Sequence, residues 1–210
     1  MMIKGIVFDL DGVICSTDEY HFLAWKKLAD RLGVPFDREK NKRLLGISRM
    51  DSLKIVLEDS KGYSDEEMRA FADEKNRYYR ELLGRMSPAD LSEEVKDTLD
   101  ELRRRKIRLA IGSSSMNAKY ILKQIGLEGF FDAVSDGTNI KHSKPDPEVF
   151  LCAARYLGLD PRDCMVVEDA KAGIEAAAAG GFESAALGEA VKCKLADFNL
   201  DSFAELLEIV

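Results

Sequence analysis

The stretch GIVFDLDGVICS, residues 5–16, contains an apolar run that leads directly into two aspartates separated by one residue. The run Ile6–Phe8 predicts a buried strand, and Gly12 permits a tight turn after it. Side chains two residues apart on an extended segment point the same way, so Asp9 and Asp11 face one point. Carboxylates this close repel each other unless a cation offsets the repulsion. A solvated turn is the alternative explanation for the pair.

A hard divalent cation such as Mg²⁺, which prefers oxygen ligands, would offset this repulsion. One aspartate could then act as a nucleophile that forms an aspartyl phosphate. The other could act as general acid and base. The opening stretch therefore indicates phosphoryl-transfer chemistry, provided that other parts of the chain supply partners for the two aspartates.

The composition is that of an ordinary globular chain, and 210 residues allow one domain with an inserted lobe. Acidic residues outnumber basic residues by 38 to 31, and the resulting net charge of −7 argues against a nucleic-acid-binding surface. The compact basic run 103–106 follows a helical pattern and is typical of a solvated helix C-terminus.

No segment of the sequence is typical of a secreted or membrane protein. The first residues lack the basic and apolar regions of a signal peptide, and no apolar run reaches the roughly 18 residues of a membrane span. The four cysteines show neither C-x-x-C nor zinc spacing and are typical of reduced thiols. We therefore expect a cytoplasmic monomer without nucleic-acid or membrane partners.

Short apolar runs alternate with helical patterns over most of the chain, which predicts a mostly parallel α/β sheet covered by helices on both faces. The predicted strands are 4–9, 107–112, 131–136, 164–169 and 183–187. The predicted helices between and after them are 93–105, 117–126, 147–158, 171–180 and 202–208. In such sheets the ligand site lies beyond the carboxyl ends of the strands.

Residues 15–91 interrupt this alternation with helical periodicity and no convincing strand. The helical segments are 18–33, 48–60 and 64–84. We therefore predict a helical domain, 15–91, inserted into a core domain made of 1–14 and 92–210. Residues 87–94 would form the return crossing, with Ser92 as the N-cap of the next helix.

Three further polar clusters follow predicted strands or lie in a loop near the same edge. The segment 112–117 contains three small hydroxyl residues, which could cap a helix or help its N-terminal amides to bind an anion. Lys144, before a proline, could bind a phosphoryl oxygen, although an exposed loop lysine is the ordinary alternative. Glu168 and Asp169 end a buried strand, which favours metal ligation because buried acids are costly unless paired.

In this order, F-D-x-D-G-V, a small hydroxyl residue, Lys-Pro and Glu-Asp resemble the haloacid dehalogenase superfamily of phosphotransferases and phosphatases over essentially the whole chain. The resemblance implies a Rossmann-like core with an inserted helical cap. Asp9 would be the nucleophile and Asp11 the general acid and base. Ser113 and Lys144 would hold the transferring phosphoryl group. The implied Mg²⁺ ligands are Asp9, the Asp11 backbone carbonyl, Asp169 and the adjacent Glu168.

The expected cap contains residues that point to a substrate. His21 and Trp25 share one helix face, where a core tryptophan with a histidine at its edge is the ordinary explanation. Together with GISRMDS (46–52) and SPAD (87–90), however, they are similar to the β-phosphoglucomutase family. That resemblance implies interconversion of β-glucose 1-phosphate and glucose 6-phosphate through a sugar bisphosphate.

The same resemblance implies roles for individual cap and loop residues. His21 would steer Asp11 toward the sugar hydroxyl. Arg49, with Ser115 and Asn117, would hold the phosphate that is not transferred, because a guanidinium binds phosphate in bidentate fashion. The other implied substrate-binding residues are Trp25, Gly46, Ser52, Lys75 and Ser114.

Several positions depart from the family pattern. Leu45 and Met116 stand where basic residues are usual, and Ser16 stands where an aspartate is usual. Arg43 or Lys119 could replace the missing positive charge. These departures leave a sugar-phosphate phosphatase of the same fold as an alternative, with a non-catalytic sugar-phosphate-binding protein as a further one.

Overall fold

The computed structural model describes residues 3–44, 47–58, 60 and 62–210, and within them six parallel strands form one sheet. The strand order is β3-β2-β1-β4-β5-β6. The strands are β1 Gly5–Phe8, β2 Arg108–Gly112, β3 Ala133–Ser135, β4 Cys164–Glu168, β5 Glu183–Ala186 and β6 Phe198–Asn199. The predicted parallel α/β core is therefore confirmed.

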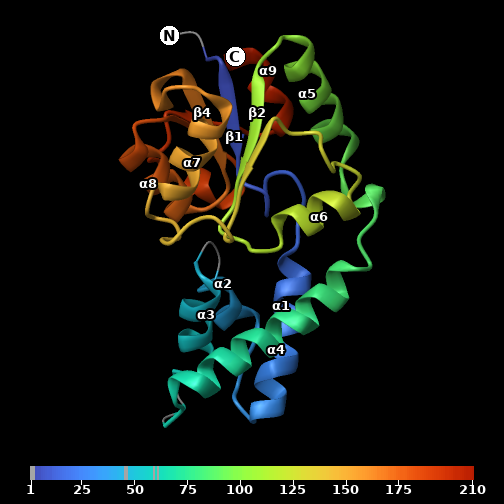
Figure 1. Cartoon of the computed structure of the whole chain (residues 1–210), viewed down its shortest axis with the longest axis vertical. Coiled ribbons are helices and arrows are strands. Elements are labelled where there is room, and N and C mark those ends of the chain that lie inside the picture. Colours follow the sequence, from blue (N-terminus) through green and yellow to red (C-terminus); the bar gives the residue numbers. More distant parts are fainter. Residues whose placement is uncertain (1–2, 45–46, 59, 61) are drawn as a thin grey trace.

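Helices cover both faces of this sheet (Figure 1). The helices α5 Glu93–Arg104, α6 Ala118–Gln124 and α9 Leu206–Ile209 contribute to the apolar layer on one face. The helices α7 Glu148–Leu157 and α8 Lys171–Gly180 contribute to the layer on the other face. The short 3₁₀ helices are η1 Pro88–Asp90, η2 Pro161–Asp163, η3 Gly188–Cys193 and η4 Phe203–Glu205.

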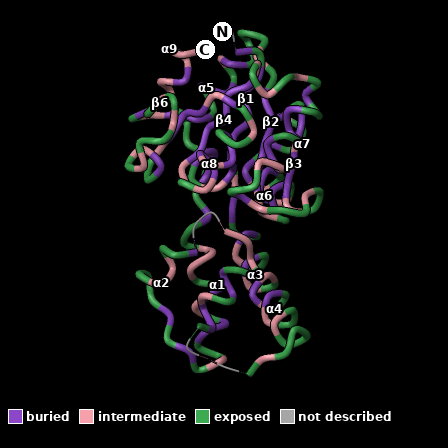
Figure 2. The backbone as a smooth tube through the Cα atoms, turned by 90° about the vertical axis from the view of Figure 1, so that its left-hand side faces the viewer, coloured by how far each residue is buried: buried purple, intermediate pink, exposed green. Residues whose placement is uncertain are grey.

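The central strand β1 is apolar on both sides because each side meets a helical layer. Ile6 and Phe8 belong to the cluster that includes α5 and α6, whereas Val7 packs with Val149 and Phe150 of α7. This double burial explains why the opening stretch is a continuous apolar run rather than an alternating one. Figure 2 shows the burial along the chain, and β1 and β4 are buried at every residue.

The structure differs from the sequence-based prediction in the last residues of the chain, 198–209. β6 was not predicted, since a strand of two residues is too short to show an apolar period. The helix predicted over 202–208 is instead the 3₁₀ helix η4 followed by the four-residue α9.

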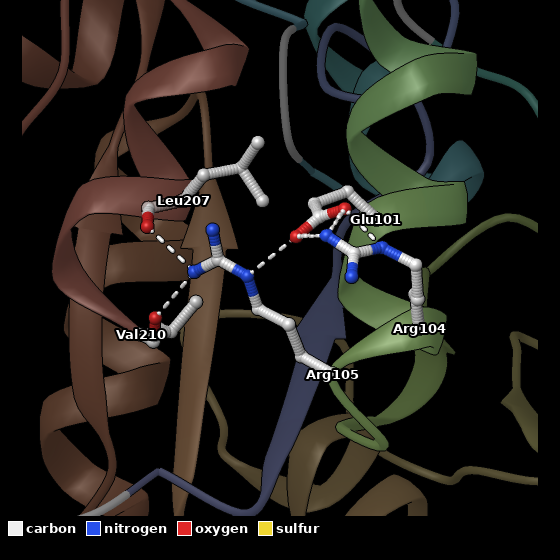
Figure 3. Close-up of polar contacts among 5 residues, drawn as sticks. All are labelled: Glu101, Arg104, Arg105, Leu207 and Val210. Carbon is white, nitrogen blue, oxygen red and sulfur yellow. Dashed lines mark hydrogen bonds and ion pairs between the residues drawn. The ribbon is translucent and has the colours of Figure 1, made fainter.

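Arg105 fastens α9 to the end of α5 (Figure 3). Its Nη1 donates to the carbonyl oxygens of Leu207, at 2.7 Å, and Val210, at 2.8 Å, while its Nε donates to Glu101 Oε1 at 2.9 Å. Arg104 donates to both oxygens of the same Glu101 carboxylate. Arg103 also pairs with Asp132 at 3.6 Å, so three members of the basic run 103–106 are engaged in contacts within the chain.

A helical part, built from segments between residues 18 and 83, lies beyond the carboxyl ends of the strands (Figure 1). Its helices are α1 Asp18–Leu32, α2 Arg38–Lys42, α3 Arg49–Val56 and α4 Asp65–Leu83. The helices α1 and α4 run antiparallel and pack along each other. The helical part has its own cluster of buried apolar side chains, which includes Trp25, Leu28, Leu53, Val56 and Ala72. The described residues of this part contain no strand, in agreement with the prediction.

Two local features show how the chain enters and leaves these helices. The short helix α2 was not predicted, because none of its residues is buried and it therefore has no apolar period. Ser92 caps α5 as predicted, since its side chain accepts a hydrogen bond from the Val95 amide. Among the described residues, no helix combines the length and apolar character that a bilayer crossing requires.

Candidate active site

The polar clusters predicted from the sequence meet at the carboxyl ends of β1, β2 and β4. The register pairs Phe8, the last residue of β1, with Ile111 on one side and Val167 on the other. The segments that leave the sheet after these residues, including Asp9 and Asp169, therefore lie together. A cavity of about 1060 Å³ separates this edge from the helical part, and residues of both parts line it.

Lys144 is a buried cation at the carboxyl ends of these strands. Its Nζ donates to Asp9 Oδ1 and, at 2.7 Å, to Glu168 Oε1. Only 2% of the Lys144 side chain is exposed, so it is not the solvated loop lysine that was the alternative interpretation. The two carboxylates keep Lys144 charged, and its pKa is raised above its usual value despite burial.

Three carboxylates surround a point next to this lysine. One oxygen each from Asp9, Glu168 and Asp169 lies within 4.8 Å of the other two. Burial, together with the neighbouring acids, raises the pKa of Asp9 to about 7 and that of Asp169 to about 8. One lysine therefore leaves this cluster short of positive charge. A hard divalent cation with oxygen ligands, such as Mg²⁺, fits that deficit and these donors.

The donors of this cluster are not equivalent. Both oxygens of Glu168 are engaged, one by Lys144 and the other by the Ala170 amide at 2.6 Å. The Asp169 carboxylate accepts no hydrogen bond from the described part of the chain, which makes it the most available donor. Gly12, at φ +82°, lies so close that a Cβ there would approach Asp169 Oδ2 to 1.9 Å. This glycine is therefore needed to bring the first loop against Asp169.

Asp11 lies apart from this group, because its carboxylate is turned toward the start of α1. The Thr17 hydroxyl donates to Asp11 Oδ1. Loss of hydration outweighs this hydrogen bond and raises the pKa of Asp11 to about 6. Of the four predicted metal residues, the structure thus groups three carboxylates and leaves Asp11 with only its backbone carbonyl for a metal.

The hydroxyl-rich loop after β2 folds on its own side chains. Ser113 Oγ accepts from the Ser115 amide, and Ser115 Oγ accepts from the Asn117 amide, both at 3.2 Å. Ser114 Oγ is buried without a hydrogen-bond partner in the described structure. Asn117 Nδ2 donates to Asn76 Oδ1 of α4 at 2.9 Å, which links this loop to the helical part. All four of these loop residues line the cavity.

Among the basic side chains that the helical part places at the cavity are His21, Lys75, Arg49 and Arg69. Lys75 Nζ lies 2.8 Å from His21 Nδ1, and Lys75 is 2% exposed. Arg49 is 22% exposed at its side chain, and its nearest carboxylate, Asp73, is 3.9 Å away. Burial lowers the pKa of both His21 and Lys75 well below their usual values. The positive charge of Arg49 lowers both pKa values further.

The remaining predicted residues are also placed by the structure. Trp25 is buried in the apolar cluster of the helical part and also borders the cavity, so both interpretations of this residue describe part of its position. Ser52 lines the cavity, and Met116, 54% exposed, contacts Arg49 through its sulfur at 3.7 Å. Gly46 and Leu45 lie outside the described residues.

The two replacement cations suggested by the sequence do not reach the cavity. Neither Arg43 nor Lys119 is among the described residues that line it. Arg43 forms a two-pronged ion pair with Glu58, at 2.8 and 2.6 Å. The described lining of the cavity therefore gives that hypothesis no support.

Comparisons with known proteins show the family to which the chain belongs. The model of the haloacid dehalogenase-like hydrolase family matches residues 3–181. The chain belongs to this family. β-Phosphoglucomutase of Bacillus subtilis is 41% identical over 190 residues, which cover 89% of this chain and 84% of that protein. The crystal structure of β-phosphoglucomutase from Clostridium difficile superposes with a TM-score of 0.92 at 37% identity, covering 98% of this chain and 93% of that one.

A phosphatase is also among the relatives of this haloacid dehalogenase-like hydrolase. The fructose-1-phosphate phosphatase of Escherichia coli is 34% identical over 181 residues, covering 86% of this chain and 94% of that protein. The chain is therefore an enzyme of this family, similar both to β-phosphoglucomutases and to a sugar-phosphate phosphatase.

From the sequence, no role was assigned to three residues whose side chains extend from the Asp11 loop to the hydroxyl-rich loop. They are Thr17, Asn76 and Tyr79, whose side chains contact Asp11, Asn117 and Thr17 respectively. A signal was available for Tyr79, because it lies four residues after Lys75 on the same face of α4. No comparable signal marks Asn76, since its partner lies 41 residues away in the sequence.

The raised pKa values of Asp9 and Asp169 predict how a metal affects stability. Without a metal, these carboxyls bind more protons in the folded than in the unfolded state between pH 4 and 8, roughly, so the free energy of unfolding falls as pH rises. We expect Mg²⁺ to raise the melting temperature more at about pH 8 than at about pH 5, because protons no longer compete for the ligands. Thermal melts with Mg²⁺ or a chelator measure this. Asp169→Asn should remove most of the difference, and equal shifts at both pH values would contradict the prediction.

Proposed function

We propose that this enzyme is a Mg²⁺-dependent phosphomutase that interconverts β-glucose 1-phosphate and glucose 6-phosphate. The reaction passes through an aspartyl phosphate on Asp9 and a sugar bisphosphate. Support comes from the likeness to proteins named β-phosphoglucomutase and from the acid, base and cation arrangement at the cavity. We further propose that it acts as a monomer in the cytoplasm, without nucleic-acid or membrane partners.

In the proposed first step, a carboxylate oxygen of Asp9 attacks phosphorus and the bond from phosphorus to the sugar oxygen breaks. Asp11 gives its proton to the departing oxygen, and a pKa near neutrality suits a group that must also take a proton back. Lys144 and Ser113 hold the phosphoryl oxygens. Asp9, Asp169, Glu168 and the Asp11 carbonyl would hold Mg²⁺, which when bound supplies positive charge against the transferring group.

The observation that carries the mutase proposal is the position of Arg49, a cation of the helical part that lies at the cavity. A phosphatase needs one phosphate site, whereas a mutase with a bisphosphate intermediate needs a second. The one carboxylate that pairs with Arg49 among the described residues is that of Asp73, which is 3.9 Å away and 81% exposed. A partly buried guanidinium whose partner is exposed and this far away is poorly compensated, and a second phosphate group would provide a close counter-charge.

We propose that residues 15–91 form a cap domain over a core made of 1–14 and 92–210. The cavity between them supports this division, as does the separate apolar cluster of the cap. A cap that closes over the sugar excludes water, which favours transfer from Asp9 to a sugar hydroxyl over hydrolysis.

The second candidate function is hydrolysis of a sugar phosphate. One observation favours it, because the apolar Met116 lies against Arg49 at the proposed second phosphate site, where a further cation would strengthen binding. A non-catalytic binding protein is not favoured, since binding alone does not require the buried pairing of Asp9 with Lys144.

The test supplies β-glucose 1-phosphate, Mg²⁺ and a trace of β-glucose 1,6-bisphosphate, and follows glucose 6-phosphate and free phosphate separately. The proposal predicts that glucose 6-phosphate forms much faster than free phosphate. Free phosphate without glucose 6-phosphate would establish the phosphatase alternative instead.

Removing the Arg49 charge should affect isomerisation selectively. We expect Arg49→Met to lower kcat/KM for β-glucose 1-phosphate by about 10- to 100-fold, the loss of one charge-assisted contact. Hydrolysis of p-nitrophenyl phosphate, which has no second phosphate, should change by less than about twofold. Arg77→Met, an exposed change on α4, is the control. An equal loss with both substrates would rule out a second-phosphate role for Arg49.

A further inference from the structure

The side chain of Tyr79, on α4, is buried against the segment between β1 and α1 that carries Asp11. Tyr79 is 1% exposed, and its hydroxyl donates to Thr17 Oγ1 at 2.9 Å. Thr17 is completely buried and donates its own proton to Asp11 Oδ1. A continuous chain of two hydrogen bonds therefore runs from the proposed cap to the proposed acid and base.

The Thr17 side chain does not cap the helix that begins after it. Thr17 is the N-cap residue of α1, where a threonine hydroxyl usually accepts a hydrogen bond from an amide of the first turn. Its side chain makes no such capping bond. Because Tyr79 occupies an acceptor site of the Thr17 oxygen, the Thr17 proton is left to point at Asp11.

The phenol is suited to act as a fixed donor. Burial, and the negative charge of Asp11, hold the pKa of Tyr79 well above its usual value, so the hydroxyl keeps its proton. Its ring packs on the His21 ring, with centroids 4.0 Å apart, and lies 4.4 Å from Lys75 Nζ. The same side chain thus contacts both the Asp11 loop and the two basic residues of the cavity.

We propose that Tyr79 is a positioning residue, which acts through Thr17 to hold the Asp11 carboxylate in one orientation while α4 occupies its place against the core. This inference rests on the proposed role of Asp11 as acid and base. The titratable groups that face Asp11 are Asp9 from the segment after β1, Asp18 from α1, Lys75 from α4 and Lys144 from the loop before α7. Tyr79 adds no charge to this set and fixes geometry alone.

Tyr79→Phe tests the inference, with Tyr78→Phe as the matched control because the Tyr78 hydroxyl binds only Glu74 in the described structure. The readout is the rate of Asp9 phosphorylation in a single turnover with two donors. Loss of an alkyl alcohol needs a proton from Asp11, whereas p-nitrophenolate leaves without one. We expect about a fivefold slower reaction with β-glucose 1,6-bisphosphate, the scale of one net hydrogen bond. With p-nitrophenyl phosphate we expect an unchanged rate.

A second pair of variants checks that the effect passes through Thr17. Thr17→Val should slow the sugar-phosphate reaction, and adding Tyr79→Phe to it should cause no further loss, because both changes break one chain. Additive losses would overturn the inference, as would an equal loss with both donors. If β-glucose 1,6-bisphosphate does not react with the unaltered enzyme, the mutase proposal fails, and fructose 1-phosphate serves as the alkyl donor for the same comparison.

Discussion

Asp9→Asn should reduce turnover by at least about a thousandfold, because the amide cannot form the proposed phosphoryl intermediate. The variant should still fold, since Lys144 keeps its contact with Glu168 and the amide has nearly the volume of the carboxyl. The measurement is glucose 6-phosphate and free phosphate production, together with acid-quench trapping of labelled protein. No label should remain on the variant.

The control for Asp9→Asn is Asp97→Asn, an exposed change on α5 that leaves the cavity untouched. It should retain full turnover and full labelling. If Asp9→Asn kept most of its turnover, the assignment of Asp9 as nucleophile would be wrong. The fold would stand, but the chemistry would have to use another group.

Lys144→Met should damage both stability and turnover. It leaves Asp9 and Glu168 buried without their cation, and breaking a buried ion pair in this way costs about 3–5 kcal/mol of unfolding free energy. Turnover should fall by about 10²- to 10³-fold, as when a donor to a transferring group is removed. Thermal melts and the product assay measure the two effects.

Two comparisons separate the charge effect of Lys144→Met from simple loss of packing. Lys141→Met changes an exposed lysine of the same loop and should have little effect on melting. The Lys144→Met defect should shrink at lower pH, where a proton neutralises the Asp9 carboxylate, whose pKa is raised by burial. A melting temperature close to that of the unaltered protein would show that Lys144 does not hold this cluster together.

The parts of the fold that could be predicted are those with a strong local pattern. The central strands are continuous apolar runs because both faces are covered, and each polar cluster directly follows one of them. Parallel strands bring such clusters to one edge, so Asp9 and Asp169 could be placed together without knowing any contact. The helices α1 and α4 could be predicted from their period and from signals such as the Ser64 capping box.

The parts that could not be predicted lack a local signal. The strand β6 and the helix α2 are too short, or too exposed, to show a period. The chain from Tyr79 through Thr17 depends on how α4 docks, which joins residues 62 positions apart. The burial of Lys144 also depends on packing, since a lysine before a proline is equally compatible with a solvated loop. Met116 against Arg49 is a contact between the two parts that no sequence period encodes.

The most direct test of the account follows one phosphorus atom. The enzyme is given β-glucose 1-phosphate labelled in its phosphate, Mg²⁺ and a trace of unlabelled β-glucose 1,6-bisphosphate. Transfer through Asp9 predicts that label passes into the bisphosphate and then into glucose 6-phosphate, with little in free phosphate. Label that appears only as free phosphate would contradict transfer to a sugar and would make the enzyme a phosphatase.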